Sequence, residues 1–205
     1  MNESIREWED EAPANGLSDL TRNDRFSAVL VILITLTALA LGLIVRQQNL
    51  NQVWLYTNRE AGIEALYPAA WLVDEKGDYV VRIFDPKARP FKTQFMVTIM
   101  PASGTTSVRN ILDSLTLQRS VDLPAYRVLN VEERNIGGLA LTQMDFAFVD
   151  ADPNPFIQRL PVVVLGTDLV ILDGDRAIIV TYMAEEDSYQ ANFPAFQRFF
   201  ASLQY

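Results

Sequence analysis

The sequence predicts an α+β protein: a single N-terminal transmembrane helix followed by an antiparallel β-sheet domain with packed helices. Three observations lead to this class. Residues 26–45 form an apolar run without a charged residue. From residue 56 onward, short apolar runs alternate with turn residues, which is typical of strands. Two later segments repeat apolar residues every three or four positions, which is typical of helices packed on a sheet.

The apolar run is long enough to cross a membrane once. Its twenty residues at about 1.5 Å each give a helix of about 30 Å, the hydrocarbon thickness of a bilayer. A cleaved signal peptide is the alternative, since Ala38-Leu39-Ala40 resembles a processing site. The apolar sequence continues for five residues beyond Ala40 and follows a long acidic segment, which favours a retained anchor. Ala38 and Gly42, four residues apart, are a candidate helix–helix contact.

The flanking charges do not orient the span. Two arginines lie near each end, Arg22 and Arg25 before it and Arg46 and Arg59 after it, so the positive-inside rule gives a tie. Because the larger folded part follows the span, we predict a cytoplasmic N-terminus and a periplasmic or extracellular C-terminal domain. The predicted parts are an acidic arm (1–25), a transmembrane helix (26–45), a linker (46–55) and an α+β domain (56–205).

The N-terminal arm is acidic and poor in apolar residues. It contains seven acidic residues and three arginines, a net charge of −4. Such a segment buries too little apolar surface to offset the entropy of ordering, so we expect it to be mobile when alone. Two interpretations remain: a solvated tail, or a segment that docks onto neighbouring subunits through Trp8 and Ile5.

The elements of the domain follow from periodicity and turn residues. A helix is predicted at 107–122 with Ser107 as its N-cap. Asp173-Gly174-Asp175 predicts a tight antiparallel hairpin between the last two strands. A C-terminal helix presents an aromatic stripe that we expect to cover one face of the sheet, formed by Phe193, Phe196, Phe200 and Leu203. The strands are predicted at 63–67, 79–84, 95–100, 126–131, 139–149, 162–172 and 177–184.

Three short motifs in this order resemble a known family. They are Tyr67-Pro68-x-x-Trp71 after a strand, Ile136-Gly137-Gly138-x-Ala140 at the start of another, and a terminal helix ending in Phe200-Ala201-Ser202-Leu203-Gln204. Residues 54–205 thereby resemble the PsbP-like family, named for the extrinsic protein of photosystem II. The resemblance implies that fold and a mostly non-enzymatic role at a membrane surface, assisting a large complex. Metal sites of that family use His in part, so none is carried over.

The composition excludes several kinds of chemistry. The 205-residue chain has no Cys and no His. It can form no disulfide, zinc–thiolate site, iron–sulfur ligation or Ser-His-Asp triad. The Ser-hydrolase, phosphate-loop and dinucleotide motifs do not occur. After the first 25 residues the net charge is −5, which repels nucleic-acid phosphates. We therefore expect no enzyme activity, no cofactor and no nucleic-acid partner.

Acidic clusters give only weak metal-site candidates. Asp150-x-Asp152-x-Asn154 begins like a calcium loop, but Pro155 and Pro161 replace the glycine and the bidentate glutamate that such a loop needs. A solvated loop is the preferred interpretation. Residues 185–187 are acidic and precede the last helix, where acids suit the helix dipole, so capping is favoured over metal binding.

Two loops are candidate docking sites. Residues 87–92 are locally basic through Lys87, Arg89 and Lys92, which suits an acidic subunit or an anionic membrane, or else marks a solvated hairpin tip. Phe156 follows two prolines that stiffen its loop. A rigid loop presenting an aromatic side chain suits protein binding; a loop folded over the core is the alternative.

These observations predict a single-pass, non-catalytic accessory or assembly subunit that stabilises a larger membrane complex. Its expected partners are other membrane protein subunits and the lipid bilayer, and the resemblance suggests an electron-transfer or photosynthetic complex. The alternative is a stand-alone membrane-tethered domain that binds a small ligand or an envelope component. A carboxylate enzyme is the third hypothesis, and it requires two acids that converge in a cleft.

Overall fold

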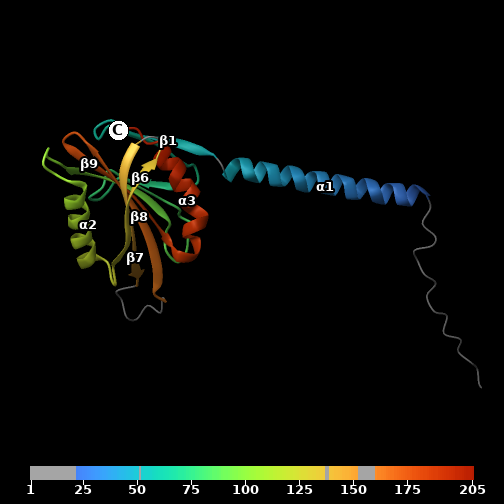
Figure 1. Cartoon of the computed structure of the whole chain (residues 1–205). Coiled ribbons are helices and arrows are strands. Elements are labelled where there is room, and N and C mark those ends of the chain that lie inside the picture. The colour runs from blue at the N-terminus through green and yellow to red at the C-terminus, as the bar shows by residue number, and fades with distance from the viewer. Residues whose placement is uncertain (1–21, 51, 137–138, 152–159) are drawn as a thin grey trace, which may run out of the picture. The chain divides into compact units, whose positions relative to one another are not determined.

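The computed structural model describes residues 22–50, 52–136, 139–151 and 160–205. The chain divides into two compact units, Met1–Asn49 and Leu50–Tyr205, and each is described separately (Figure 1).

The first unit contains one long helix, α1 (Arg22–Leu50). Its window Phe26–Leu43 has a mean hydropathy of 2.5, and no residue of that window is buried. The two threonine hydroxyls in it donate to carbonyls one turn earlier, Thr35 to Val31 at 2.9 Å and Thr37 to Leu33 at 2.8 Å, so their polarity is satisfied within the helix. The helix is long and apolar enough to cross a membrane, properties that a signal sequence shares.

The second unit is an α+β domain with two antiparallel sheets. A two-stranded sheet pairs β1 with β2, and a seven-stranded sheet has the order β3-β4-β5-β9-β8-β7-β6. The strands are β1 (Val53–Asn58), β2 (Ile63–Pro68), β3 (Leu72–Asp74), β4 (Val81–Phe84), β5 (Gln94–Pro101), β6 (Arg127–Ile136), β7 (Leu139–Asp150), β8 (Val162–Asp173) and β9 (Arg176–Glu185). The predicted fold class is confirmed.

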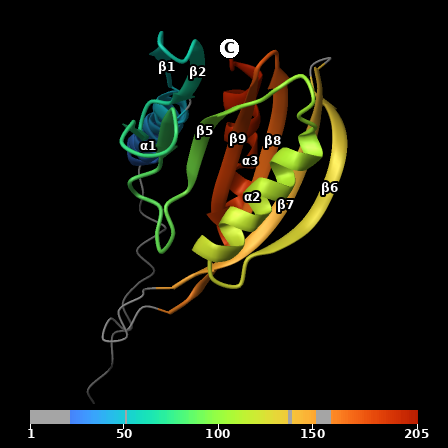
Figure 2. The same ribbon diagram turned by 90° about the vertical axis from the view of Figure 1, so that its left-hand side faces the viewer.

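Two helices cover opposite faces of the large sheet (Figure 2). On one face, α2 (Val108–Asp122) buries Ile111, Leu112 and Leu115 against Met144 and Ile179. On the other, α3 (Glu186–Ala201) buries its aromatic residues in the main core, which includes Tyr182 and the central ring of Phe95. Strands β8 and β9 are buried on both faces because helices cover both, and most of their residues are apolar.

Local signals in the sequence set the helix ends and the last hairpin. Ser107 caps α2 and accepts a hydrogen bond from the Asn110 N–H, as predicted. The acidic residues at the start of α3 lie in its first turn. The β8–β9 hairpin forms as predicted, with Asp173 opposite Arg176 and with Gly174 at φ 62°, a left-handed conformation that glycine adopts easily. In α3, Phe196 and Phe200 are buried as expected, and Phe199 joins them.

Two strands were not predicted. The expected linker 46–55 contains the end of α1 and the first half of β1, because Val53-Trp54-Leu55-Tyr56 is an apolar, aromatic run that pairs with β2. The three-residue strand β3 is too short to show periodicity. The strands β1 and β2 also form a sheet of their own. The other edge of β2 is bridged by Gln204 near the C-terminus, through two backbone hydrogen bonds with Glu64 of 3.0 and 2.8 Å.

Candidate functional site

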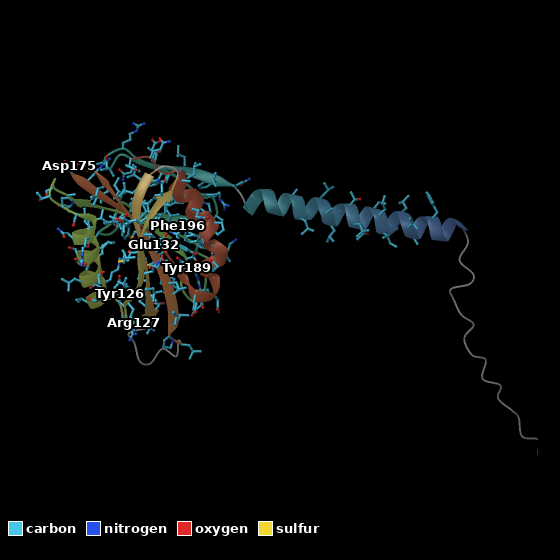
Figure 3. All side chains as sticks on the ribbon, in the orientation of Figure 1. Tyr126, Arg127, Glu132, Asp175, Tyr189 and Phe196 are labelled. Carbon is cyan, nitrogen blue, oxygen red and sulfur yellow. The ribbon has the colours of Figure 1, made fainter. Side chains whose placement is uncertain are left out.

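A cleft opens between α3 and strands β6 and β7. It consists of two adjoining hollows of about 220 and 350 Å³ that share Gln143 and Phe193. Figure 3 labels Tyr189 and Phe196 on α3 and Glu132 on β6, the elements between which the cleft opens. The helix α3 packs on β8 and β9. It therefore leaves the same face of β7 and β6, the next strands toward the edge of the sheet, accessible.

The floor of the cleft is a line of hydrogen-bonded polar side chains. Gln143 and Asp145 are two residues apart on β7 and therefore face the same side. The Gln143 amide donates to both Asp145 oxygens, at 2.9 and 3.0 Å. The Thr167 hydroxyl donates to Asp145 and also contacts the Tyr189 hydroxyl. Burial raises the pKa of Tyr189, so its phenol stays neutral at physiological pH. Asp145 is half-buried and remains the acceptor at the centre of this line.

The walls of the cleft are aromatic on one side and charged at one end. Phe193, Phe196 and Phe200 of α3 form the aromatic wall. At the β6 end, Arg134 pairs with Glu132, its Nε lying 2.8 Å from Glu132 Oε1. The carboxylates of Glu132 and Asp145 thus already have donor partners. Apolar walls around a few convergent polar groups are the composition of a binding cleft.

The opposite face of the sheet carries a buried ion pair. Arg119 of α2 makes a two-point contact with Asp168 of β8, whose side chain is completely buried. Thr181 donates a further hydrogen bond to Asp168 at 2.6 Å. Burial by itself would lower the pKa of Arg119, but the adjacent Asp168 carboxylate holds that pKa above its usual value. This cluster ties α2 to the sheet.

A third feature is an exposed apolar surface along β6, one edge of the large sheet. Val128, Leu129 and Val131 are 38, 60 and 49% exposed. The register shifts between Val128 and Asn130, so Leu129 is the extra residue of a bulge. Leu129 lines the cleft beside α3, on the other face of the sheet from Val128 and Val131, which face α2. A hollow of about 630 Å³ separates Val128 and Val131 from Leu112 of α2. The sequence predicted a strand at 126–131 but not its place at the edge of the sheet, since periodicity does not reveal which strands lie at an edge.

The outer face of α2 extends this apolar character. Leu117 and Val121 are one helical turn apart, and they are 70 and 80% exposed. We call these two residues, together with Val128 and Val131, the β6–α2 surface.

The predicted basic loop lies between β4 and β5 with Lys87, Arg89 and Lys92 all exposed. Arg89 donates to the carbonyls of Pro86 and Ala88, at 2.9 and 2.8 Å, and Lys92 lies 4.8 Å from the centre of the Phe84 ring. Two of the three cations therefore also contact their own hairpin. Docking through this loop stays a prediction.

The remaining predicted contact residues divide between the two parts of the chain. Ala38 and Gly42 are both exposed on α1, one turn apart. Trp8, Ile5 and Phe156 lie outside the described residues, as does the calcium-like stretch after residue 151.

No protein-family model and no curated protein sequence matches this chain. Solved structures do match it. Cyanobacterial PsbP (CyanoP) from a Synechocystis species is 17% identical with a TM-score of 0.53, covering 74% of this chain and 91% of that one. LpqN, involved in cell envelope biogenesis of Mycobacterium tuberculosis, is 13% identical with a TM-score of 0.49, covering 75% and 90%. The Saccharomyces cerevisiae Ran-binding protein Mog1p is 8% identical with a TM-score of 0.48, covering 75% and 95%. The similarity to CyanoP shows that the domain has the PsbP-like fold that its motifs predicted.

Proposed function

We propose that this chain is a single-pass membrane protein whose PsbP-like domain is a non-catalytic accessory module that docks onto another membrane protein. The helix α1 supports the anchor, since its apolar window is fully exposed and long enough to span a bilayer. The β6–α2 surface carries the docking proposal. Four large apolar side chains from two neighbouring elements face solvent there, and such clusters mark protein interaction sites.

The chemistry of this surface favours a protein partner. An edge strand has backbone groups that another chain can pair with, and flanking apolar side chains add contact area. The bulge at Leu129 interrupts regular pairing, so side-chain contacts in the hollow between β6 and α2 would contribute most. By its resemblance to the PsbP-like family, we propose an electron-transfer or photosynthetic membrane complex as the assembly, with the domain on the periplasmic or extracellular side.

Purification from native membranes in mild detergent tests this proposal. The full chain with an affinity tag should co-purify with a membrane protein in fixed stoichiometry. Val131→Glu should lose that partner, because a buried, unpaired carboxylate opposes docking. Val73→Glu is the matched control, since Val73 is 37% exposed on β3 at the other edge of the same sheet. A wild-type chain that elutes alone, or a Val131→Glu chain that keeps the partner, contradicts the proposal.

The cleft beside α3 favours a second candidate: a tethered domain that binds a small ligand or an envelope component. Asp145 at the floor and the aromatic wall suit an amine attached to a ring. Phenethylamine should raise the melting temperature of the full chain more than phenylacetate does. Asp145→Asn should remove this difference, while Asp150→Asn at the end of the same strand should keep it. Equal shifts by both compounds would exclude this candidate.

A further inference from the structure

The two-stranded sheet has one apolar face that the rest of the domain leaves exposed. Its inner face is buried through Tyr56, Ile63, Ala65 and Tyr67. On the outer face, Val53, Leu55 and Leu66 are 47, 61 and 40% exposed. Residues that oppose each other across two strands share a face, and Leu55 opposes Leu66 while Val53 opposes Pro68. The result is an exposed ladder of apolar pairs.

The apolar pairs lie at the end of the hairpin that follows α1. The next outward pair along the hairpin, Thr57 with Glu64, is polar. Trp54 begins the inner face and is still 60% exposed, with its ring edge-on to Tyr67 at 6.5 Å. Apolarity therefore decreases along the hairpin away from the point where the chain leaves α1.

A cation lies beside this ladder. Val53, Leu66 and Pro68 line a hollow of about 570 Å³ whose other wall is α3. Arg198 in the last turn of α3 lines the same hollow and is exposed. An apolar floor with an arginine at its side matches a membrane interface, where the aliphatic stem lies against hydrocarbon and the guanidinium reaches the phosphates.

The chain connection is short enough for this surface to reach the membrane that α1 is proposed to cross. The apolar window ends at Leu43, α1 ends at Leu50 and β1 begins at Val53. Seven helical residues at about 1.5 Å and three extended residues at about 3.4 Å span at most about 20 Å. Headgroup regions add about 5–8 Å on each side of the hydrocarbon, so the hairpin can reach them.

We propose that the outer face of the β1–β2 hairpin, with Arg198 beside it, rests on an anionic lipid surface, that of the bilayer crossed by α1. This inference rests on the proposed membrane anchor. Glu64 holds the far end of the hairpin in water. The bilayer thereby supports the domain from below and restricts its rotation.

Spin labels on the full chain test the inference, because the protein has no cysteine and each introduced cysteine is unique. Leu55→Cys and Leu66→Cys are labelled in nanodiscs of phosphatidylglycerol and phosphatidylcholine. Collision with oxygen reports lipid, and collision with a water-soluble nickel chelate reports solvent. The oxygen-to-nickel ratio should be several-fold higher at both positions than at Gln118→Cys, a control at an exposed position of α2 outside the β6–α2 surface.

A label at Leu36→Cys in α1 separates the two proposals. A high oxygen-to-nickel ratio at Leu36, with ratios at Leu55 and Leu66 equal to that at Gln118, overturns the hairpin contact and leaves the anchor intact. A low ratio at Leu36 overturns the anchor and the hairpin contact together. Near-UV circular dichroism confirms that each labelled chain is folded. The oxygen-to-nickel ratios at Leu55 and Leu66 should agree, because the two residues oppose each other on the same face.

The role of Arg198 is tested in the same nanodiscs. Arg198→Gln should lower the ratio at Leu55 on anionic lipid and leave it unchanged on pure phosphatidylcholine. Arg59→Gln, an exposed arginine at the polar end of the hairpin, should change neither. An unchanged ratio for Arg198→Gln on anionic lipid overturns the choice of an anionic surface.

Discussion

Arg119 of α2 and Asp168 of β8 form an ion pair in the interior, with Asp168 completely buried and Arg119 Nη2 2.8 Å from Asp168 Oδ1. The Arg119 guanidinium also lies 4.4 Å from the centre of the Phe146 ring. One side chain of α2 thus contacts both β7 and β8, and the helix is held by charge as well as by its apolar face.

Removing one partner of this pair should be costly. Arg119→Met leaves an unpaired buried carboxylate, and we expect the free energy of unfolding to fall by about 3–5 kcal/mol. Urea unfolding of the full chain in detergent, followed by circular dichroism, measures this loss. Arg109→Met, on the exposed side of the same helix, should change it by less than about 0.5 kcal/mol. The double variant Arg119→Met/Asp168→Leu should regain most of the loss; no recovery would contradict this explanation.

A side chain at Gly166 should destabilise the domain because Phe146 lies opposite it on β7. A Cβ built on Gly166 would overlap the Phe146 ring, with Cε1 only 2.7 Å away. Phe146 is fully buried, so Gly166→Ala should cost about 1–3 kcal/mol through overpacking. Gly104→Ala, where nothing lies within 4 Å of the new Cβ, is the control. Adding Phe146→Leu to Gly166→Ala should cost less than the separate losses combined, and strict additivity would argue against the overlap.

The N-cap of α2 should contribute measurably to stability. Ser107→Ala removes the acceptor of the Asn110 N–H, so we expect a loss of about 1 kcal/mol in the free energy of unfolding. Ser114→Ala, on the exposed side of the same helix, should be neutral or slightly stabilising because alanine is the better helix former. Equal effects of the two substitutions would show that the cap adds nothing.

Stability should fall in alkaline solution through Tyr56. Burial and the hydrogen bond from Tyr56 to Glu75 raise the pKa of Tyr56 to about 12, from its ordinary 10.0. Between these values the unfolded chain loses the phenol proton and the folded chain keeps it. The stabilisation is therefore complete below pH 10 and decreases as the pH rises toward 12.

Tyr56→Phe should make this alkaline decrease shallower while lowering stability at neutral pH by about 1 kcal/mol, through its lost hydrogen bonds. Urea midpoints measured from pH 8 to 12 provide the comparison. Leu115→Ala, which truncates a buried side chain of α2, should lower the urea midpoint at every pH without changing the slope of the curve. Parallel curves for wild type and Tyr56→Phe would refute the assignment.

Much of the fold could be predicted because its signals are local. The Asp-Gly turn, the Ser107 cap and the spacing of Phe196 and Phe200 each depend on residues within a few positions of one another. The candidate site could not be predicted in this way. Gln143, Asp145, Thr167 and Tyr189 come from three elements, and each looked like an ordinary strand or helix residue. Their meeting depends on strand order and on the position of α3.

The sequence by itself determined the apolar span, the class of the domain, its helices and its last hairpin, because hydrophobic periodicity and turn chemistry act along the chain. The tertiary structure alone decided that β5 pairs with β9, that Arg119 meets Asp168 and that β6 forms an edge with exposed apolar residues. Periodicity tells which face of a strand is apolar and is silent on what will cover that face. Covering depends on contacts between residues far apart in the chain, and these form only when the whole domain packs.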